Sequence, residues 1–413
     1  MPARFSAPRG TFDVLPADSV RRAELYVAAS QALTRAGYGR IETPVFEDTA
    51  LFARGVGAST DIVQKEMFSF EDQGGRGLTL RPESTASICR AYVQHGMHKL
   101  PQPVKLWCWG PFFRHERPQA GRFRQFHQLD VETIGTDDPL ADAESIILLD
   151  GILRGIGVPG VELRLGSLGS PASRAAYREE LAAHLRSHEN DLSADVRSRI
   201  DQNPLRAFDS DHAGTRETMA SAPTMLDRLD SDDAEHFEAV KGLLDQAGVE
   251  YTLDGTLVRG LDYYTRTVFE FTSDRLGAQS ALGGGGRYDG LVAELGGPET
   301  PAVGWAAGIE RILLALGERA EEPTLDVFVA AADGQRERAL AAVTELRGAG
   351  LRADLDLAGR SIKGQMKQAD RTGASRAVVL GDDGSAKLRD MDSGEQREAD
   401  LATILAELKE SGG

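Results

Sequence analysis

The chain has few cysteines, few aromatic residues and no long apolar run. Its 413 residues include two cysteines, Cys89 and Cys108, and 6% aromatic side chains. Two cysteines without a CxxC spacing argue against a disulfide framework or a cysteine-rich zinc site, so we expect buried thiols. No segment reaches the roughly 20 apolar residues that span a bilayer, and the start lacks the apolar core of a signal peptide. We therefore expect a globular cytoplasmic protein without membrane contact.

Positive charge is scarce relative to negative charge. The chain carries 47 Lys and Arg against 64 Asp and Glu, a formal net charge of −17. This balance argues against broad affinity for nucleic acid, because phosphate contacts depend on Lys and Arg. Residues 171–256 hold nine basic and eighteen acidic side chains, so the middle of the chain is the most acidic part. Any nucleic-acid contact must be local, and the sequence assigns no role to this acidic region.

The 41% apolar content is enough for a large core divided among two or three domains. In the first half, periodicity and turn residues predict elements in this order: helix 18–37, strand 41–47, a strand running into a helix at 79–85, helix 140–156 and strand 161–165. Residues 171–255 then show a helical pattern without clear strands. We interpret them as an inserted helical domain.

Strand-like sequence returns at 260–271, and a small-residue segment at 302–311 passes from strand to helix. After a charged linker, apolar strands alternate with helices: strand 325–330, helix 334–349, strand 351–356, helix 360–372, strand 377–380 and helix 400–410. This order predicts a small α/β domain with a mostly parallel sheet.

Residues 112–132 carry the strongest chemical signal. They predict two strands joined by a basic loop, with Arg114 and Glu116 on one face of the first strand and Gln128 and Asp130 on one face of the second. Arginine matches phosphate well, because its planar fork donates two parallel hydrogen bonds. The hairpin therefore predicts a site for phosphoryl or nucleotidyl transfer.

Three other segments place polar residues inside apolar sequence: 80–85, 258–264 and 304–311. Burying such groups without partners costs about 1–3 kcal/mol for each unsatisfied group. A polar ligand shared by all four segments would remove that cost.

Together these segments closely resemble the histidyl-tRNA synthetases, which are class II aminoacyl-tRNA synthetases, over essentially the whole chain. Residues 9–16 are similar to the family's N-terminal signature, the hairpin 112–132 resembles class II motif 2, and 304–311 resembles motif 3. Segments 259–264 and 281–289 resemble the two histidine-specific motifs. Segment 259–264 discriminates most, because other class II synthetases lack it.

The resemblance implies a fold and a reaction. The fold is an α+β catalytic domain from residues 1–170 and 256–318 with an antiparallel sheet flanked by helices, a helical insertion at 171–255, and an anticodon-binding α/β domain at 324–413. In the reaction, the carboxylate of L-histidine attacks the α-phosphorus of ATP, pyrophosphate leaves, and the terminal adenosine of tRNA(His) takes the histidyl group. The family further implies Mg²⁺ carried by ATP, no metal held by the protein itself, and a homodimer with Pro44 near its interface.

The resemblance also implies roles for single residues. Arg114 and Arg259 would be the catalytic cations at the α-phosphate and would also contact histidine. The remaining ATP-binding residues are Glu116, Arg122 and Arg311, and Gln119 would approach the tRNA acceptor end. Glu132 and Tyr264 would contact the two imidazole nitrogens. The other histidine-binding residues are Glu83, Thr85, Gln128, Tyr263 and Tyr288.

Simpler interpretations remain open for several of these features. In one such interpretation, Arg114 and Glu116 form only a structural ion pair. In another, the adjacent residues Tyr263 and Tyr264 are strand aromatics that face opposite sides of the sheet. Residues 283–286, four glycines, fit a flexible turn or a close backbone approach to a ligand. His184 and His188 are four residues apart but lack a third zinc ligand, so solvated histidines are favoured. The last domain carries a basic stripe, which consists of Arg360, Lys363, Lys367 and Arg371. This stripe is either a solvated face or an anticodon-stem contact.

Two other functions compete with histidine activation. One is the synthetase-like regulatory subunit of ATP phosphoribosyltransferase, which typically lacks the C-terminal domain and has a degraded 259–264 segment, whereas both are present here. The other is a synthetase for threonine, proline or glycine, which segments 259–264 and 281–289 oppose; threonine enzymes also need a zinc cluster that is not visible. Pyrophosphate exchange that depends on histidine separates these alternatives.

Overall fold

A computed structural model describes residues 5–57, 60–119, 121–257, 261–277, 280–317 and 325–411. The chain divides into two compact units, a larger one of residues 1–15 and 19–318 and a smaller one of residues 16–18 and 319–413. None of the helices in the described ranges is long and apolar enough to cross a membrane.

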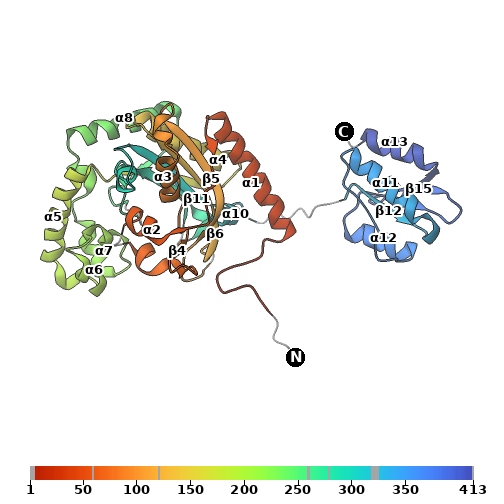
Figure 1. Cartoon of the computed structure of the whole chain (residues 1–413), viewed down its shortest axis with the longest axis horizontal. Coiled ribbons are helices and arrows are strands. Elements are labelled where there is room, and N and C mark those ends of the chain that lie inside the picture. Colours follow the sequence, from red (N-terminus) through yellow and green to blue (C-terminus); the bar gives the residue numbers. More distant parts are fainter. Residues whose placement is uncertain are drawn as a thin grey trace. The chain divides into compact units, whose positions relative to one another are not determined.

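The larger unit is built on an eight-stranded sheet (Figure 1). The six central strands run antiparallel, and a short strand pairs in parallel with each outer one. In spatial order the strands are β1 (Gly39–Arg40), β5 (Val104–Phe113), β6 (Gln125–Ile134), β11 (Ala302–Gly308), β10 (Ala281–Arg287), β9 (Thr265–Ser273), β7 (Val161–Ser167) and β8 (Thr252–Leu253).

Helices cover one face of this sheet and bury most of the apolar core. The helices α1 (Pro16–Arg35), α4 (Pro139–Gly155), α8 (Ser231–Ala247) and α10 (Ile309–Ala315) contribute side chains to one cluster with β5, β6, β7, β9 and β11. A second cluster on the other face joins α3 (Thr85–Gln94) and α9 (Leu291–Glu294) to side chains of β5, β6 and β9 and to three tyrosines. These three tyrosines are Tyr263, Tyr264 and Tyr288.

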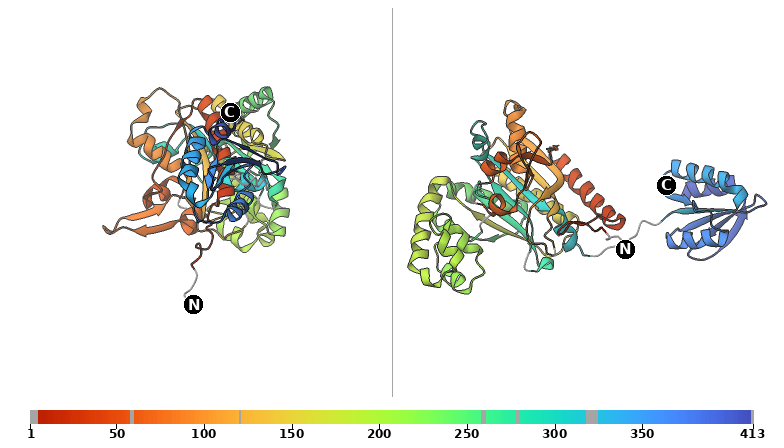
Figure 2. Two further views of the ribbon diagram at one scale, coloured as in Figure 1. Left: turned by 90° about the vertical axis from the view of Figure 1, so that its right-hand side faces the viewer. Right: turned by 60° about the horizontal axis from the view of Figure 1, so that its bottom comes forward.

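Two smaller elements complete the larger unit. A three-stranded sheet, ordered β2 (Phe46–Asp48), β4 (Gly77–Leu80) and β3 (Phe68–Glu71), lies beside α2 (Thr49–Gly55). The helices α5 (Pro171–Ser187), α6 (Ala194–Arg199) and α7 (Ala213–Ala220) form a lobe with its own small apolar core beside the sheet (Figures 1 and 2). The expected helical character of this part of the chain is confirmed.

The smaller unit has a five-stranded sheet in the order β13 (Ala353–Leu355), β12 (Val327–Ala331), β14 (Arg376–Leu380), β15 (Ala386–Asp390) and β16 (Gln396–Ala399). The first three strands are parallel, whereas β15 and β16 add an antiparallel hairpin that the sequence reading missed. Its helices are α11 (Arg336–Gly348), α12 (Ile362–Arg371) and α13 (Leu401–Ser411). The α+β and α/β fold classes are both confirmed.

Three local predictions were wrong. The strand expected at 41–47 is split, with residues 41–45 outside β1 and β2; Pro44 has no N–H for a ladder, and the carbonyl of Thr43 accepts from Nη1 of Arg81. The strand expected at 260–271 begins only at Thr265. Finally, Arg114 and Glu116 lie beyond β5, because the N–H of His115 donates to Glu66 instead of continuing the ladder.

Candidate active site

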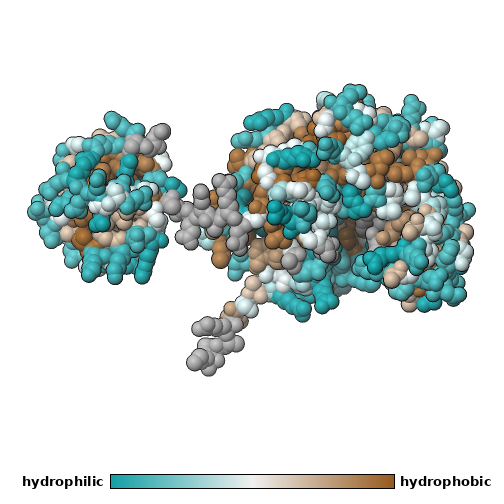
Figure 3. All heavy atoms as spheres, turned by 180° about the vertical axis from the view of Figure 1, so that it is seen from behind, coloured by the Kyte–Doolittle hydropathy of each residue, from teal (hydrophilic) through white to brown (hydrophobic). Residues whose placement is uncertain are grey.

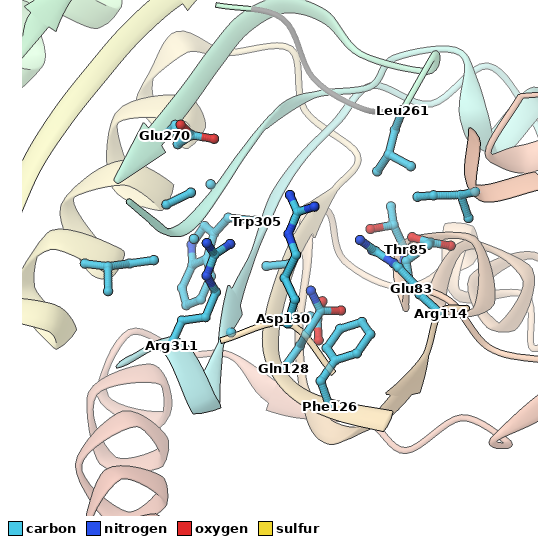
Figure 4. Close-up of a pocket in the computed structure, with 18 of the residues that line it drawn as sticks. Glu83, Thr85, Arg114, Phe126, Gln128, Asp130, Leu261, Glu270, Trp305 and Arg311 are labelled. Carbon is cyan, nitrogen blue, oxygen red and sulfur yellow. Dashed lines mark hydrogen bonds between the residues drawn. The ribbon is translucent and has the colours of Figure 1, made fainter. Parts of the chain in front are cut away.

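A cavity of about 620 Å³ opens on the sheet face that carries α3, and most of the predicted site residues line it (Figure 4). Glu83, Thr85 and Arg114 lie at one end, and Trp305, Arg311 and Glu270 at the other. The predicted residues in its wall are Glu83, Thr85, Arg114, Glu116, Arg122, Gln128, Tyr263, Tyr264, Tyr288 and Arg311. Of the rest, Glu132 is buried and hydrogen-bonded to Thr85 and Tyr288 of this wall, Gln119 is exposed on the loop between β5 and β6, and Arg259 lies outside the described residues.

Glu83 anchors the start of α3. Its two carboxylate oxygens accept from the backbone N–H groups of Thr85 (2.7 Å) and Ala86 (3.0 Å), which are among the donors that a helix start leaves without intrahelical partners. Burial raises the pKa of this carboxyl, while the two backbone N–H groups act in the opposite direction. A helix start thus fixes a carboxylate in the cavity wall.

Glu132 is held by two hydroxyls at the same end. Oγ1 of Thr85 donates to Oε1 (2.6 Å), and the phenol of Tyr288 donates to Oε2. Glu132 is 1% exposed, and burial raises its pKa to about 8, with a further upward contribution from Asp130 and a downward one from the two hydroxyls. Burial thus favours the protonated form of this side chain, whereas a cation nearby would favour the ionised form.

Asp130 is a functional candidate to which sequence reasoning gave no role. It lines the cavity between Gln128 and Glu132 on β6, as the two-residue repeat of a strand requires. Burial raises its pKa to about 7, and the charge of Glu83 adds to this. The sequence did contain a signal for Asp130, because it lies two residues from both Gln128 and Glu132 on the same strand.

Gln128 offers an acceptor to a ligand. Its Oε1 is buried and, within the described residues, has no hydrogen-bond partner. Buried polar atoms in folded proteins nearly always have partners. Together with the three carboxylates, this oxygen makes one end of the cavity a site for a group that carries several N–H donors.

Both adjacent tyrosines, Tyr263 and Tyr264, line the cavity. The expectation that they face opposite sides was wrong, because they precede β9 and are not part of a strand. Their rings lie 4.7 Å apart, and the ring of Tyr263 lies 5.6 Å from that of Tyr288. The three rings form one apolar wall with hydroxyl groups at its edges.

Tyr288 is fixed from both sides along the chain. Arg287 is completely buried and pairs with the equally buried Asp142. Asp289 accepts from Oγ1 of Thr265 (3.2 Å) and from a backbone N–H of β11 (3.3 Å). A buried charge pair is costly to break once formed, so this arrangement holds the phenol that reaches Glu132.

The four glycines at 283–286 belong to β10 and are not a flexible turn. A Cβ on Gly285 would stand 1.9 Å from the carbonyl oxygen of Gly304 on β11. A Cβ on Gly304 would in turn stand 1.8 Å from Oε2 of Glu132. These glycines therefore bring β10 close to β11 and leave room for the carboxylate of Glu132.

Arginines dominate the rest of the cavity wall. The guanidinium of Arg114 lies 5.3 Å from the ring centre of Phe126, and its Nε donates to the carbonyl of Pro82 (2.9 Å). Arg122 pairs with Glu116 at 3.3 Å, so Arg114 and Glu116 are not an ion pair with each other in this structure. Burial lowers the pKa of Arg311, and the charge of Arg122 lowers it further. A bound polyanion would relieve both effects.

The N-terminal segment supports the loop between β5 and β6. The N–H of Arg124 donates to the carbonyl of Gly10 (2.7 Å), and the rings of Phe12 and Phe123 lie 4.5 Å apart. A Cβ on Gly10, where φ is +86°, would stand 2.8 Å from Cγ of Arg124. Residues 9–16 thus contact the loop that carries Gln119 and Arg122.

Other residues singled out in the sequence lie outside this cavity. The thiols of Cys89 and Cys108 are free and buried, as expected. Nε2 of His184 and Nδ1 of His188 each lie 3.0 Å from a backbone carbonyl oxygen. The basic stripe is exposed on and just before α12, with Arg360 paired to Asp356 at 2.5 Å.

Comparisons with known proteins identify the family of the chain. The family model "Histidyl-tRNA synthetase" matches residues 10–312, and "Anticodon binding domain" matches residues 326–411. A protein of Saccharopolyspora erythraea named "Histidine--tRNA ligase" is 48% identical over 416 residues, which cover 98% of this chain and 99% of the relative.

Two solved structures of similar fold carry related names. The apo histidyl-tRNA synthetase of S. aureus has a TM-score of 0.81 and 37% identity, with 98% of this chain and 100% of that chain covered. A Bacillus halodurans protein described as an ATP phosphoribosyltransferase regulatory subunit/histidyl-tRNA synthetase has a TM-score of 0.66 and 26% identity, with coverage of 87% and 95%. The chain belongs to the histidyl-tRNA synthetase family.

Proposed function

We propose that this chain is a histidine–tRNA ligase, which activates L-histidine with ATP and transfers it to tRNA(His). The observation that carries the proposal is a single cavity with buried carboxylates at one end and arginines along the rest of its wall. A zwitterionic amino acid fits the carboxylate end and a polyphosphate fits the arginines, when the two molecules lie end to end in the cavity. Relatives that match nearly the whole chain are named for the same reaction.

The carboxylate end is the proposed histidine site. Glu132 accepts from one imidazole nitrogen, and Tyr264 contacts the other. Glu83, Thr85 and Gln128 receive the α-ammonium group, and the oxygen of Gln128 that lacks a partner among the described residues supports this. We add Asp130 as a further negative charge near the ammonium. Tyr263 and Tyr288 form the apolar wall beside the ring. A pocket of this kind rejects analogues by leaving its own buried groups unpaired.

Arginines at the α-phosphate supply the proposed catalysis. Adenylate formation passes through an anionic transition state, and donors fixed in advance stabilise such charge most effectively. Arg114 is fixed against Phe126 and the carbonyl of Pro82, so little reorganisation is needed when ATP binds. We assign the second cation at this phosphate to Arg259. Arg311 contacts the outer phosphates, and Glu116 and Arg122 complete the ATP site.

Magnesium would enter with ATP. Within the described ranges, no group of three His, Cys, Asp or Glu side chains is placed to hold a metal ion. Mg²⁺ commonly uses one or two carboxylates together with substrate phosphates and water, and Glu270 lines the cavity at the Arg311 end. The residues therefore fit an ion that is held mainly by the nucleotide and neutralises its charge.

Two regions are proposed to contact tRNA. Gln119, on the exposed loop next to the cavity, would meet the acceptor end. The basic stripe of Arg360, Lys363, Lys367 and Arg371 would contact the anticodon stem, because it places exposed cations on one face of a chain that is acidic overall. The domain boundaries at 171, 256 and 324 belong to the same proposal.

We also propose a homodimer that uses the small sheet. Val45, Phe46 and Phe70 are 41%, 46% and 46% exposed, and the two phenylalanine rings lie 6.3 Å apart beside Pro44. Exposed apolar side chains gathered in one place are typical of protein interfaces. In the view from behind in Figure 3, other apolar areas lie among the hydrophilic surface of the larger unit.

The regulatory-subunit alternative is less well supported. A silent paralogue has no need of arginines fixed along the cavity or of an anticodon-binding domain, and the domain model matches residues 326–411. Aminoacylation tests the choice directly. Purified protein should attach labelled histidine to a tRNA(His) transcript when ATP and Mg²⁺ are present, and should not charge a tRNA(Pro) transcript with proline. Absence of histidyl-tRNA in the presence of active transcript would overturn the proposal.

A further inference from the structure

One buried carboxylate, that of Asp233, connects the inserted helical region to the chain segment that forms part of the proposed histidine pocket. Asp233, in the first turn of α8, is 1% exposed. It accepts from the N–H of Ser170 (2.6 Å) and the hydroxyl of Ser173 (2.9 Å) at the start of α5, and from Nε of Arg266 (3.0 Å). One side chain on α8, a helix that packs on the main sheet, therefore joins the start of α5 to the segment that follows Tyr263 and Tyr264.

Arg266 has an unusual backbone conformation. Its φ of +47° makes it the one non-glycine residue with positive φ among those described. This region is unfavourable for a residue with a Cβ and persists where the surroundings impose it. Its N–H donates to Gly169 (2.9 Å), and its carbonyl accepts from Leu168 (2.7 Å). Contacts on both backbone groups and on the side chain thus impose the conformation.

The same segment is irregular in its pairing. Gly286 pairs with Val268, but the next residue, Arg287, pairs with Thr265, so two residues of β9 bulge out at Arg266. Bulges re-aim neighbouring side chains and are frequent beside functional sites. The conformation at Arg266 therefore sets the direction in which the chain leaves β9 toward Tyr264.

A second contact from the insertion reaches Tyr264 itself. Nη2 of Arg174, on α5, donates to the backbone carbonyl of Tyr264. Behind this segment lies a separate cavity of about 580 Å³, which Arg174, Tyr263, Tyr264 and Arg266 line. The two tyrosines thus form a wall with a cavity on each side. Contacts from the insertion, more than close packing from behind, hold this wall in place.

We propose that Asp233 is a positioning residue for histidine binding, which acts through Arg266 and so couples the placement of the inserted helices to the aim of Tyr264. The inference rests on the proposed function, because it assumes that Tyr264 contacts histidine. Movement of the helices away from β9 would release Arg266 and Tyr264 together. Histidine affinity then depends on how the insertion is seated, whereas ATP affinity does not.

The test compares Michaelis constants of full-length variants in ATP–pyrophosphate exchange. Asp233→Asn removes the charge that holds Arg266 and should raise the KM for histidine at least fivefold, with the KM for ATP within twofold of the unmodified protein. Asp232→Asn is the matched control: Asp232 is an exposed carboxylate in the same first turn of α8, and within the described residues it has no hydrogen bond with Arg266, Ser170 or Ser173. Its histidine KM should not change. An unchanged histidine KM in Asp233→Asn, or equal increases for histidine and ATP, would overturn the inference.

A second pair of variants decides the question even if Asp233→Asn fails to fold. Glycine adopts positive φ without penalty, so Arg266→Gly should keep the backbone conformation better than Arg266→Ala. The expected result is a larger rise in histidine KM for alanine than for glycine; the reverse order, or no change in either, contradicts the proposal. Failure of the unmodified protein to exchange pyrophosphate with histidine would instead refute the proposed function.

Discussion

Replacing Glu132 by glutamine should weaken histidine activation and stabilise the free protein, two effects of opposite sign from one buried carboxyl. Glutamine keeps the shape and one acceptor oxygen for the hydroxyls of Thr85 and Tyr288 but cannot ionise. Loss of a charged acceptor for an imidazole N–H costs about 1.5–3 kcal/mol. We therefore expect kcat/KM for histidine to fall about 100-fold, which corresponds to about 2.7 kcal/mol.

The stability effect follows from the raised pKa. Burial raises the pKa of Glu132 to about 8, against about 4.3 in an unfolded chain. The folded state therefore keeps the proton that the unfolded state releases between these values, and stability falls as pH rises through this window. From pH 6 to pH 8 the loss amounts to about 2 kcal/mol. A glutamine at this position does not titrate, so the stability of the variant relative to the unmodified protein should increase by about that amount over the interval.

Urea unfolding followed by tryptophan fluorescence measures this difference. All three tryptophans, Trp107, Trp109 and Trp305, lie in the larger unit, so the signal reports the unit that contains Glu132. Glu42→Gln, which changes an exposed glutamate, is the control and should track the unmodified protein at both pH values. A stability difference for Glu132→Gln that stays constant between pH 6 and pH 8 would refute the assigned burial effect. Undiminished histidine kcat/KM would remove Glu132 from the binding site.

Three further outcomes follow from the site. Gly304→Ala places a Cβ where Oε2 of Glu132 lies and should raise the histidine KM at least tenfold, whereas Gly155→Ala, whose Cβ meets no neighbour within 4 Å, should not; equal KM values would contradict the packing argument. Histidine binding at pH 7 should release protons, because its ammonium favours ionised Asp130 and its imidazole N–H favours ionised Glu132, and the pKa values of these two groups in the free protein are raised to about 7 and about 8; affinity should rise from pH 6.5 to pH 8, and a calorimetric enthalpy independent of the buffer would exclude this. A chain without residues 324–413 should retain pyrophosphate exchange but lose charging of tRNA(His), and unimpaired charging would refute the anticodon-binding role.

The sequence was sufficient to predict the fold class, and ten of the thirteen residues that it selected for the site line the cavity. Gln128 and Glu132 lie on β6 with the two-residue spacing of a strand, and the facing of Gln128 and Asp130 followed from that period alone. Helix α3 starts just after Pro82, as the strand-to-helix pattern indicated. Strong local periodicity therefore predicted these elements well.

The errors arose where tertiary contacts override a local pattern. Tyr263 and Tyr264 have strand-forming side chains, yet a turn precedes β9 because Arg174 binds the carbonyl of Tyr264 and the chain bulges at Arg266. No local signal marks a contact between residues about 90 positions apart. Similarly, the partner of Glu116 is Arg122, across a loop, and not the nearby Arg114.

The role of Asp130 was missed for a different reason. A carboxylate in a strand usually faces water, and the sequence does not report that this one is 1% exposed beside Glu83 and Glu132. Three buried carboxylates in one place become meaningful only when the cavity is known, because their cost must be offset by a cation. The resemblance to a family predicted which amino acid binds, whereas the structure showed that three buried carboxylates lie together and call for a cation.

Whether this cavity activates histidine is decided by pyrophosphate exchange with each of the twenty amino acids. Purified full-length protein is incubated with ATP, Mg²⁺, labelled pyrophosphate and one amino acid at a time. We expect rapid exchange with histidine and background exchange with the other nineteen. Background exchange with histidine, or equal exchange with proline, threonine or glycine, would contradict it.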